Sequence, residues 1–186
     1  MRLFIAVDLD DNIKEKIIEE TIPIRSKGTD IAFTTSENLH VTMKFLGEVA
    51  EQQLKGLKED ISNTLAGVKQ FKINIKGMGY FGRPEFMKVI WLGVDKDNGR
   101  DELVNIIKSL NNALKHIRTE DHDPHPHITI GRVKTCKNKE ILLHEVKSKS
   151  NLEIGEMLVK QIVLKKSELS EKGPIYTDLM TINLEK

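Results

Sequence analysis

Residues 40–46 read HVTMKFL and residues 127–133 read HITIGRV, and both stretches begin with histidine, an apolar residue, threonine and a second apolar residue. We call these four-residue patterns, at 40–43 and 127–130, the first and second His-x-Thr motifs. Their alternation of polar and apolar side chains is typical of strands with one buried face. Because side chains at positions i and i+2 lie on the same face of a strand, the histidine and threonine of each motif are predicted to point together.

Strand-like and helix-like segments alternate along the rest of the chain. Apolar residues recur at helical spacing in residues 13–18, 54–65, 103–117 and 139–147. Strand-like runs lie at residues 2–9, 40–46, 71–75, 88–94, 127–133, 158–165 and 176–184. This mixture predicts an α+β fold with largely antiparallel sheets.

The glycine-rich stretch GMGYFG at residues 77–82 matches the letters of a dinucleotide-binding loop. A strand-like run follows it, whereas that loop must open a helix. We therefore predict a turn between two strands at this position.

The spacing of the two motifs indicates how the chain is organised. They are separated by close to half of the 186 residues, and each follows a helix-like segment and a loop. Such a repeat is the trace that an internal duplication would leave. We therefore expect residues 1–186 to form a single domain with two similar lobes facing each other.

Composition excludes several classes of protein. The chain is 39% hydrophobic and 31% charged, and 29 basic residues nearly balance 28 acidic ones, for a net charge of +1. A general DNA-coating role is disfavoured by this balance. No apolar run approaches the length of a membrane span, and the N-terminal stretch MRLFIAVDLDD lacks the pattern of a signal peptide, so we expect a cytoplasmic protein. The single cysteine, Cys136, excludes an internal disulfide and a cysteine-based zinc cluster.

Two histidine–threonine pairs that face each other would suit chemistry on a phosphate. A neutral imidazole can accept a proton from water, while a protonated imidazole can donate one to a leaving alkoxide. The ordinary imidazole pKa of about 6.5 suits both tasks near neutral pH. The threonine hydroxyls would bind the non-bridging oxygens as charge builds on them.

The sequence resembles the 2H phosphoesterase superfamily, and within it the LigT/ThpR branch of RNA 2',3'-cyclic phosphodiesterases, also called 2'-5' RNA ligases. The resemblance extends over essentially the whole chain. It is carried by RLFIAVDL (2–9), ENLHVTMKFLGEV (37–49), VIWLGV (89–94), PHPHITIGRV (124–133) and SELSEKGPIY (167–176). It implies two pseudo-symmetric lobes, each a mainly antiparallel sheet with helices on its outer face, and an active-site cleft between them.

The resemblance also implies an activity and a set of site residues. The reaction is metal-free hydrolysis of a 2',3'-cyclic phosphate at an RNA end, without a cofactor, leaving a 2'-phosphomonoester. His40 would be the proton donor to the 3' oxygen, and His127 would be the proton acceptor that activates water. Thr42, Thr129 and Arg132 would bind the substrate phosphate.

The strand pattern argues against a contact between Arg132 and the substrate phosphate. Strict alternation puts it on the face opposite His127, so it reaches the phosphate only if the strand bulges or ends near Gly131. Phe45 and Tyr176 are candidates for stacking on a substrate base.

Partners follow from the same resemblance. We expect a monomer that acts on RNA ends bearing 2',3'-cyclic phosphate, such as tRNA halves, and that has no membrane partner. The chain lacks a G-x-x-x-x-G-K-[ST] loop, so any 2'-5' ligation is expected to be the ATP-independent reverse reaction.

Three alternatives stay open at this point. The first is a non-catalytic module that binds RNA ends or nucleotides, and the second is a phosphodiesterase for a small cyclic nucleotide. The segment DHDPHPH at residues 121–127 also contains the residue types of a metal site. No distant cysteine and no His-Glu-x-x-His helix completes a ligand set for it, so we predict no metal.

Overall fold

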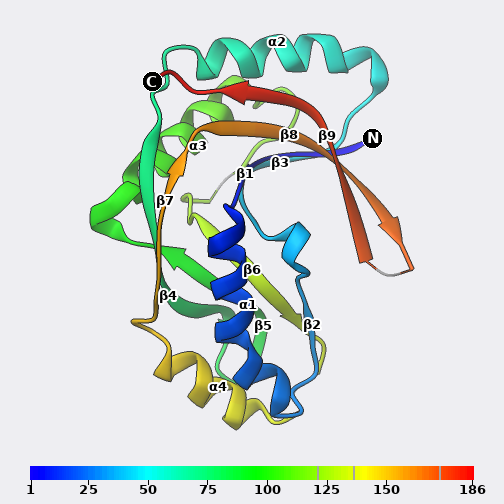
Figure 1. Cartoon of the computed structure of the whole chain (residues 1–186). Coiled ribbons are helices and arrows are strands. Elements are labelled where there is room, and N and C mark those ends of the chain that lie inside the picture. The colour runs from blue at the N-terminus through cyan, green and yellow to red at the C-terminus, as the bar shows by residue number, and fades with distance from the viewer. Residues whose placement is uncertain (121, 136, 172) are drawn as a thin grey trace.

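The computed structural model describes residues 1–120, 122–135, 137–171 and 173–186 and has the predicted α+β class (Figure 1). The strands are β1 (Arg2–Asp8), β2 (Ile31–Phe33), β3 (His40–Glu48), β4 (Phe71–Arg83), β5 (Phe86–Val94), β6 (His127–Val133), β7 (Glu153–Val159), β8 (Gln161–Ser170) and β9 (Gly173–Asn183). The α-helices are α1 (Asp11–Ser26), α2 (Leu54–Leu65), α3 (Asp101–Ala113) and α4 (Lys139–Ser148).

The strands form one sheet made of two four-stranded parts. Its order is β7-β4-β5-β6-β3-β1-β8-β9, with β2 added beside β6, and all of these pairings are antiparallel. We call β7-β4-β5-β6 the β6 lobe and β3-β1-β8-β9 the β3 lobe. Each lobe ends in the strand that carries a His-x-Thr motif, and the two motif strands meet at the seam.

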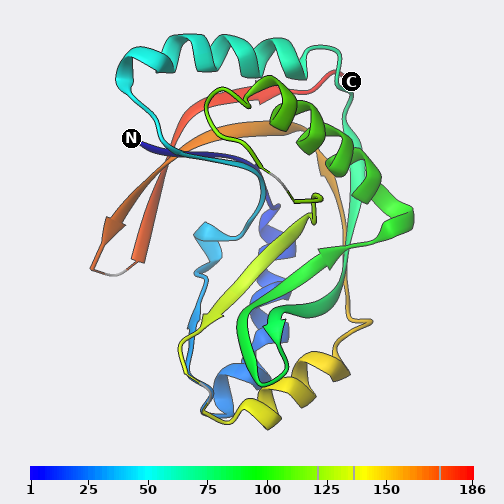
Figure 2. The ribbon, with the colours of Figure 1, turned by 180° about the vertical axis from the view of Figure 1, so that it is seen from behind.

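Each lobe has its own pair of helices. In the β3 lobe α3 contacts β3 and α2 contacts β9, whereas in the β6 lobe α1 contacts β7 and α4 contacts β4 and β5. Helix α1 crosses in front of β6 in Figure 1 and behind it in Figure 2, so it covers one face of this part of the sheet. These helices form because their apolar residues recur at three- and four-residue spacing, as at Leu103, Ile106, Ile107 and Leu110 of α3, all of which are buried.

Two predictions about strand boundaries are wrong. Strand β4 continues through residues 77–82, where the glycine pattern predicts a turn, and the chain turns instead between Arg83 and Phe86. A Cβ atom on Gly79 would lie only 2.4 Å from the Trp91 ring, so this glycine makes room for a side chain on β5 rather than for a turn. The strand expected at 158–165 is divided between β7 and β8, which separate at Lys160.

The short strand β2 is not predicted by the sequence, since three residues carry too little of the alternating pattern. No helix within the described ranges is long and apolar enough to cross a membrane. Two residues named above, Cys136 and Asp121, lie outside the described residues.

Candidate active site

The two motifs meet at the seam between the lobes. Val41 of β3 pairs with Ile128 of β6 in antiparallel register, and both side chains are buried. The neighbouring positions of an antiparallel pair share the opposite face, so both histidine–threonine pairs lie on that face, side by side. The alternation predicted from the sequence is confirmed, because the apolar residues of both motifs are buried and the histidines and threonines are partly exposed.

His40 is oriented by two hydrogen bonds. Its Nδ1 lies 2.7 Å from the backbone oxygen of Asn38, and its Nε2 lies 3.0 Å from Oγ1 of Thr42. A carbonyl oxygen only accepts, so Nδ1 carries a proton and donates it. When the ring is neutral, Nε2 accepts from the Thr42 hydroxyl, and when it is protonated, Nε2 donates.

His127 is held by the same contact in the second motif. Its Nδ1 lies 2.7 Å from the backbone oxygen of His125, again two residues before the motif histidine. Nδ1 is therefore the donor here as well, which leaves Nε2 of the neutral ring as a lone-pair acceptor. Nε2 of His127 has no hydrogen-bond partner among the described residues. In both motifs Nε2 is therefore the ring nitrogen that the backbone does not hold, and in His40 it contacts the Thr42 hydroxyl.

Burial lowers the pKa of both imidazoles below the ordinary histidine value. For His40 the hydrogen bond to Asn38 and the negative charge of Asp8 act in the opposite direction. For His127 the positive charge of Arg132 lowers the pKa further. The charge of His127 also acts on His40, so the two rings are close enough to influence each other's protonation.

Aromatic side chains surround His40. The Phe4 ring centroid lies 5.1 Å from that of His40 and 4.8 Å from that of Tyr176, and Tyr176 meets His40 edge-on at 5.5 Å. Phe45 lies 6.1 Å from Phe4 and keeps 46% of its surface exposed. The structure therefore brings both predicted base contacts, Phe45 and Tyr176, to the His40 side of the site, where each packs against Phe4.

A second aromatic group lies on the His127 side. Phe81 meets the His127 ring edge-on at 4.8 Å, and Trp91 lies 4.8 Å from His125. His125 thus packs against an indole. Within the described residues, from which Asp121 is absent, no group of three or more histidine, cysteine, aspartate or glutamate side chains could hold a metal ion.

A bulge in β6 turns Arg132 toward the site. Thr129 pairs with Trp91 but Gly131 pairs with Ile90, so one extra residue of β6 lies between two successive residues of β5. This reverses the alternation beyond Thr129 and puts Arg132 on the face of His127. The charge of Arg132 acts on both His127 and Tyr176, which agrees with that placement.

The profile of the 2'-5' RNA ligase superfamily matches residues 13–170. This chain belongs to that superfamily. It is 35% identical over 184 residues to an RNA 2',3'-cyclic phosphodiesterase of Methanothermobacter thermautotrophicus, with 99% of each chain covered. It is 41% identical over 180 residues to an RNA 2',3'-cyclic phosphodiesterase of Archaeoglobus fulgidus, covering 96% of this chain and 98% of the relative. The resemblance drawn from the sequence is confirmed.

Solved structures of similar proteins share the fold. The Thermus thermophilus protein TT0787 superposes with a TM-score of 0.82 at 24% identity, covering 99% of this chain and 98% of the other. Escherichia coli LigT complexed with 3'-AMP superposes with a TM-score of 0.78 at 23% identity, covering 100% and 98%. These likenesses confirm the two-lobed α+β architecture.

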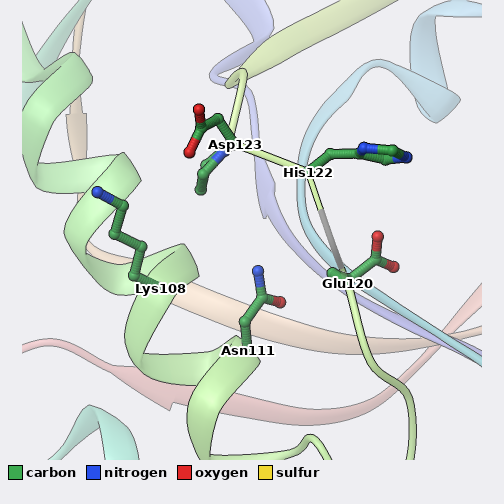
Figure 3. Close-up of a pocket in the computed structure, with 6 residues that line it drawn as sticks. Lys108, Asn111, Glu120, His122 and Asp123 are labelled. Atoms are coloured by element: carbon green, nitrogen blue, oxygen red, sulfur yellow. The ribbon is translucent and has the colours of Figure 1, made fainter.

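A buried lysine of β3 in this superfamily member contacts α3 and the segment that leads to β6. Lys44 is only 3% exposed, and its Nζ donates to Oδ1 of Asn111 on α3 and to the backbone oxygen of Arg118, in the segment that leads to β6. Figure 3 shows Asn111 and Glu120 beside an open pocket between α3 and this segment. The negative charge of Glu120 favours the ammonium form of Lys44 and offsets part of the burial that lowers its pKa.

Sequence reasoning missed several residues of the site. Phe4 and Asp8 lie next to His40, and Lys165 binds Asp8. The sequence pattern does not assign the faces of the strands that carry these three residues. One signal was present in the sequence, since Lys165 directly follows the apolar run IVL at residues 162–164, and a lysine that is buried there needs charged partners.

Proposed function

We propose that this chain hydrolyses 2',3'-cyclic phosphate ends of RNA to 2'-phosphomonoesters by acid–base catalysis with two histidines. The observation that carries the proposal is the equivalent anchoring of His40 and His127. Each Nδ1 donates to a backbone oxygen two residues upstream, so Nε2 is the nitrogen through which each ring would exchange a proton with substrate, in His40 from beside the Thr42 hydroxyl. A binding module would not need two proton-transfer groups. The names of the two relatives described above support the same activity.

The proposed step is a displacement at phosphorus. His127 Nε2 accepts a proton from water while the water oxygen bonds to phosphorus and the bond from phosphorus to the 3' oxygen breaks. His40 Nε2 donates its proton to that 3' oxygen, leaving a 3'-hydroxyl and a 2'-phosphate. Proton transfer by positioned side chains typically contributes about 10²- to 10⁴-fold to the rate.

The remaining site residues stabilise the charge that develops on the phosphate. The hydroxyls of Thr42 and Thr129 would donate to its non-bridging oxygens, and the guanidinium of Arg132 would add a fixed positive charge. Phe45 and Tyr176 would contact the terminal base. Several observations support these roles. Thr42 and Tyr176 contact His40, and Phe45 packs against Phe4 beside it. Thr129 shares a strand face with His127, and the charge of Arg132 acts on that ring.

Ligation is the second part of the proposal. In this step the 5'-hydroxyl of one RNA would bond to the phosphorus of the 2',3'-cyclic phosphate of another, and the bond from phosphorus to the 3' oxygen would break. The products are a 2'-5' phosphodiester and a 3'-hydroxyl, and no ATP is consumed. The substrates would be RNA ends such as those of tRNA halves, and the protein would act as a cytoplasmic monomer.

Product analysis tests the proposal. An oligoribonucleotide ending in 2',3'-cyclic phosphate is incubated in EDTA without ATP, alongside free 2',3'-cyclic nucleotides as small-molecule substrates. We expect a 2'-phosphate as sole product and a higher kcat/KM for the oligonucleotide. A 3'-phosphate would contradict the role of His40, and activity that required zinc or manganese would revive the metal site at residues 121–127. Binding without turnover would indicate a non-catalytic module.

A further inference from the structure

A buried lysine holds two carboxylates on the strands beside His40. Lys165 of β8 is 8% exposed, and its Nζ lies 2.9 Å from Oδ2 of Asp8 on β1 and 2.6 Å from Oδ1 of Asp178 on β9. We call these three residues the Asp8–Lys165–Asp178 triad. Asp8 is directly opposite His40 in the antiparallel register of β1 and β3. The triad therefore begins at the position that pairs with the proposed proton donor.

The triad gives the two histidines different electrostatic surroundings. It contains two carboxylates and one ammonium, so its net charge is negative. The groups that act on His40 from neighbouring strands are Asp8 on β1, Lys165 on β8 and His127 on β6, and the Tyr176 ring of β9 also packs against it. The charge that acts on His127 is the guanidinium of Arg132. A carboxylate thus lies beside His40, and a guanidinium lies near His127.

We propose that the Asp8–Lys165–Asp178 triad assigns the acid and base roles: Asp8 favours the charged form of His40, and Lys165 holds the Asp8 carboxylate in place and limits its effect. The inference rests on the proposed function of His40 as proton donor. Asp8 and Lys165 are then positioning residues that act through His40, without touching substrate.

The balance of charge within the triad gives the two residues opposite effects. The negative charge of Asp8 raises the pKa of His40, and the positive charge of Lys165 lowers it. The two carboxylates in turn raise the pKa of Lys165 above the ordinary lysine value and keep it charged, although burial acts against this. Arg132 favours the neutral ring of His127, which suits a proton acceptor.

The direct test is an NMR titration of the His40 ring in the substrate-free protein. Asp8→Asn removes the negative charge, so the pKa of His40 should fall, while Lys165→Gln should raise it by a smaller amount. A purely structural role would not produce shifts of opposite sign. The matched control is Asp11→Asn, which makes the same charge change at a side chain that is 95% exposed, and should leave the His40 titration unchanged.

A double variant covers the case in which Lys165→Gln fails to fold with two unpaired carboxylates. Asp8→Asn combined with Lys165→Gln removes the charges of both Asp8 and Lys165, and the pKa of His40 should then be higher than in Asp8→Asn alone. If Asp8→Asn and the double variant both titrate like the wild type, the triad has no such role.

The kinetic counterpart separates this inference from the proposed function. The limb of kcat/KM that falls with increasing pH should move to lower pH in Asp8→Asn and to higher pH in Lys165→Gln. If the His40 titration moves as expected and the kinetic limb does not, the triad acts on His40 but His40 is not the proton donor. If neither moves, the triad inference is wrong and the donor role of His40 is untouched.

Discussion

At the scale of single residues, the backbone orients the two histidines. A histidine side chain has two nitrogens, and catalysis at one requires that the other be held. The backbone oxygens of Asn38 and His125 hold Nδ1 of the two motif histidines, at 2.7 Å in both motifs. Because Pro126 precedes His127 and favours an extended conformation at His125, the local sequence helps to present that carbonyl.

Replacing the Thr42 hydroxyl separates its role from that of His40. We expect Thr42→Val to lower kcat/KM by about 10- to 100-fold, since it removes a hydroxyl that lies 3.0 Å from His40 Nε2 and would donate to the phosphate. Both limbs of the pH profile should remain, because a hydroxyl does not titrate in this range. Thr42→Ser keeps the hydroxyl and is the control, with activity close to wild type. Loss of either limb in Thr42→Val would contradict the assignment of that limb to a histidine.

The motif residues could be predicted because they depend on one strand alone. The rule that residues i and i+2 share a face places His40 with Thr42 from the sequence by itself. The neighbours Asp8 and Lys165 could not be placed in this way, since their proximity depends on which strands pair with β3 and in which register.

At the scale of elements, the bulge in β6 decides whether Arg132 faces the phosphate. Gly131, next to it, is packed tightly against β2. A Cβ atom there would lie 2.5 Å from Cγ2 of Ile31 and 3.1 Å from the backbone oxygen of Ala32. Glycine is therefore required for β2 and β6 to pair at this point.

Gly131→Ala should both destabilise the protein and misplace Arg132. We expect a loss of about 1 to 3 kcal/mol in the free energy of unfolding, as for other overpacked sites, together with a raised KM. Urea unfolding and steady-state kinetics measure the two effects. Gly56→Ala in α2 is the matched control, because nothing lies within 4 Å of its Cβ position and alanine is the better helix former. An unchanged stability and KM in Gly131→Ala would show that the bulge does not position Arg132.

Bulges and glycines are the least predictable features of these strands. Strict alternation places Arg132 on the wrong face, and only the pairing of β6 with β5 reveals the extra residue. The glycines of residues 77–82 suggest a turn when they are interpreted as local signals. Their role depends instead on a distant partner, since Gly79 leaves room for the Trp91 ring.

At the scale of the whole molecule, the pseudo-symmetry predicted from the two motifs is present, but the lobes are not successive halves of the chain. The C-terminal strands β8 and β9 join β1 and β3, whereas β4 and β5 from the first half join β6 and β7. The spacing of the motifs could not reveal this exchange, because strand order is set by long-range packing. The consequence is that each motif strand lies at the inner edge of its lobe, and one pair, Val41 with Ile128, brings the motifs together.

The catalytic pairing of the two histidines, one from each lobe, is tested by the pH dependence of kcat/KM on a 2',3'-cyclic-phosphate-ended RNA. The measurement is made for the wild type and for single histidine variants. For the wild type we expect a bell-shaped profile. The apparent pKa of each limb should lie below the ordinary histidine value, because burial lowers the pKa of both imidazoles.

His127→Ala should abolish the limb that rises with pH, and His40→Ala should abolish the limb that falls. Each should reduce kcat/KM by about 10²- to 10⁴-fold, or roughly 3 to 5 kcal/mol. His144→Ala, at an exposed position on α4, is the control and should keep the wild-type profile. Near-wild-type turnover in a folded His40→Ala or His127→Ala protein, with both limbs intact, would contradict the assignment of the catalytic pair.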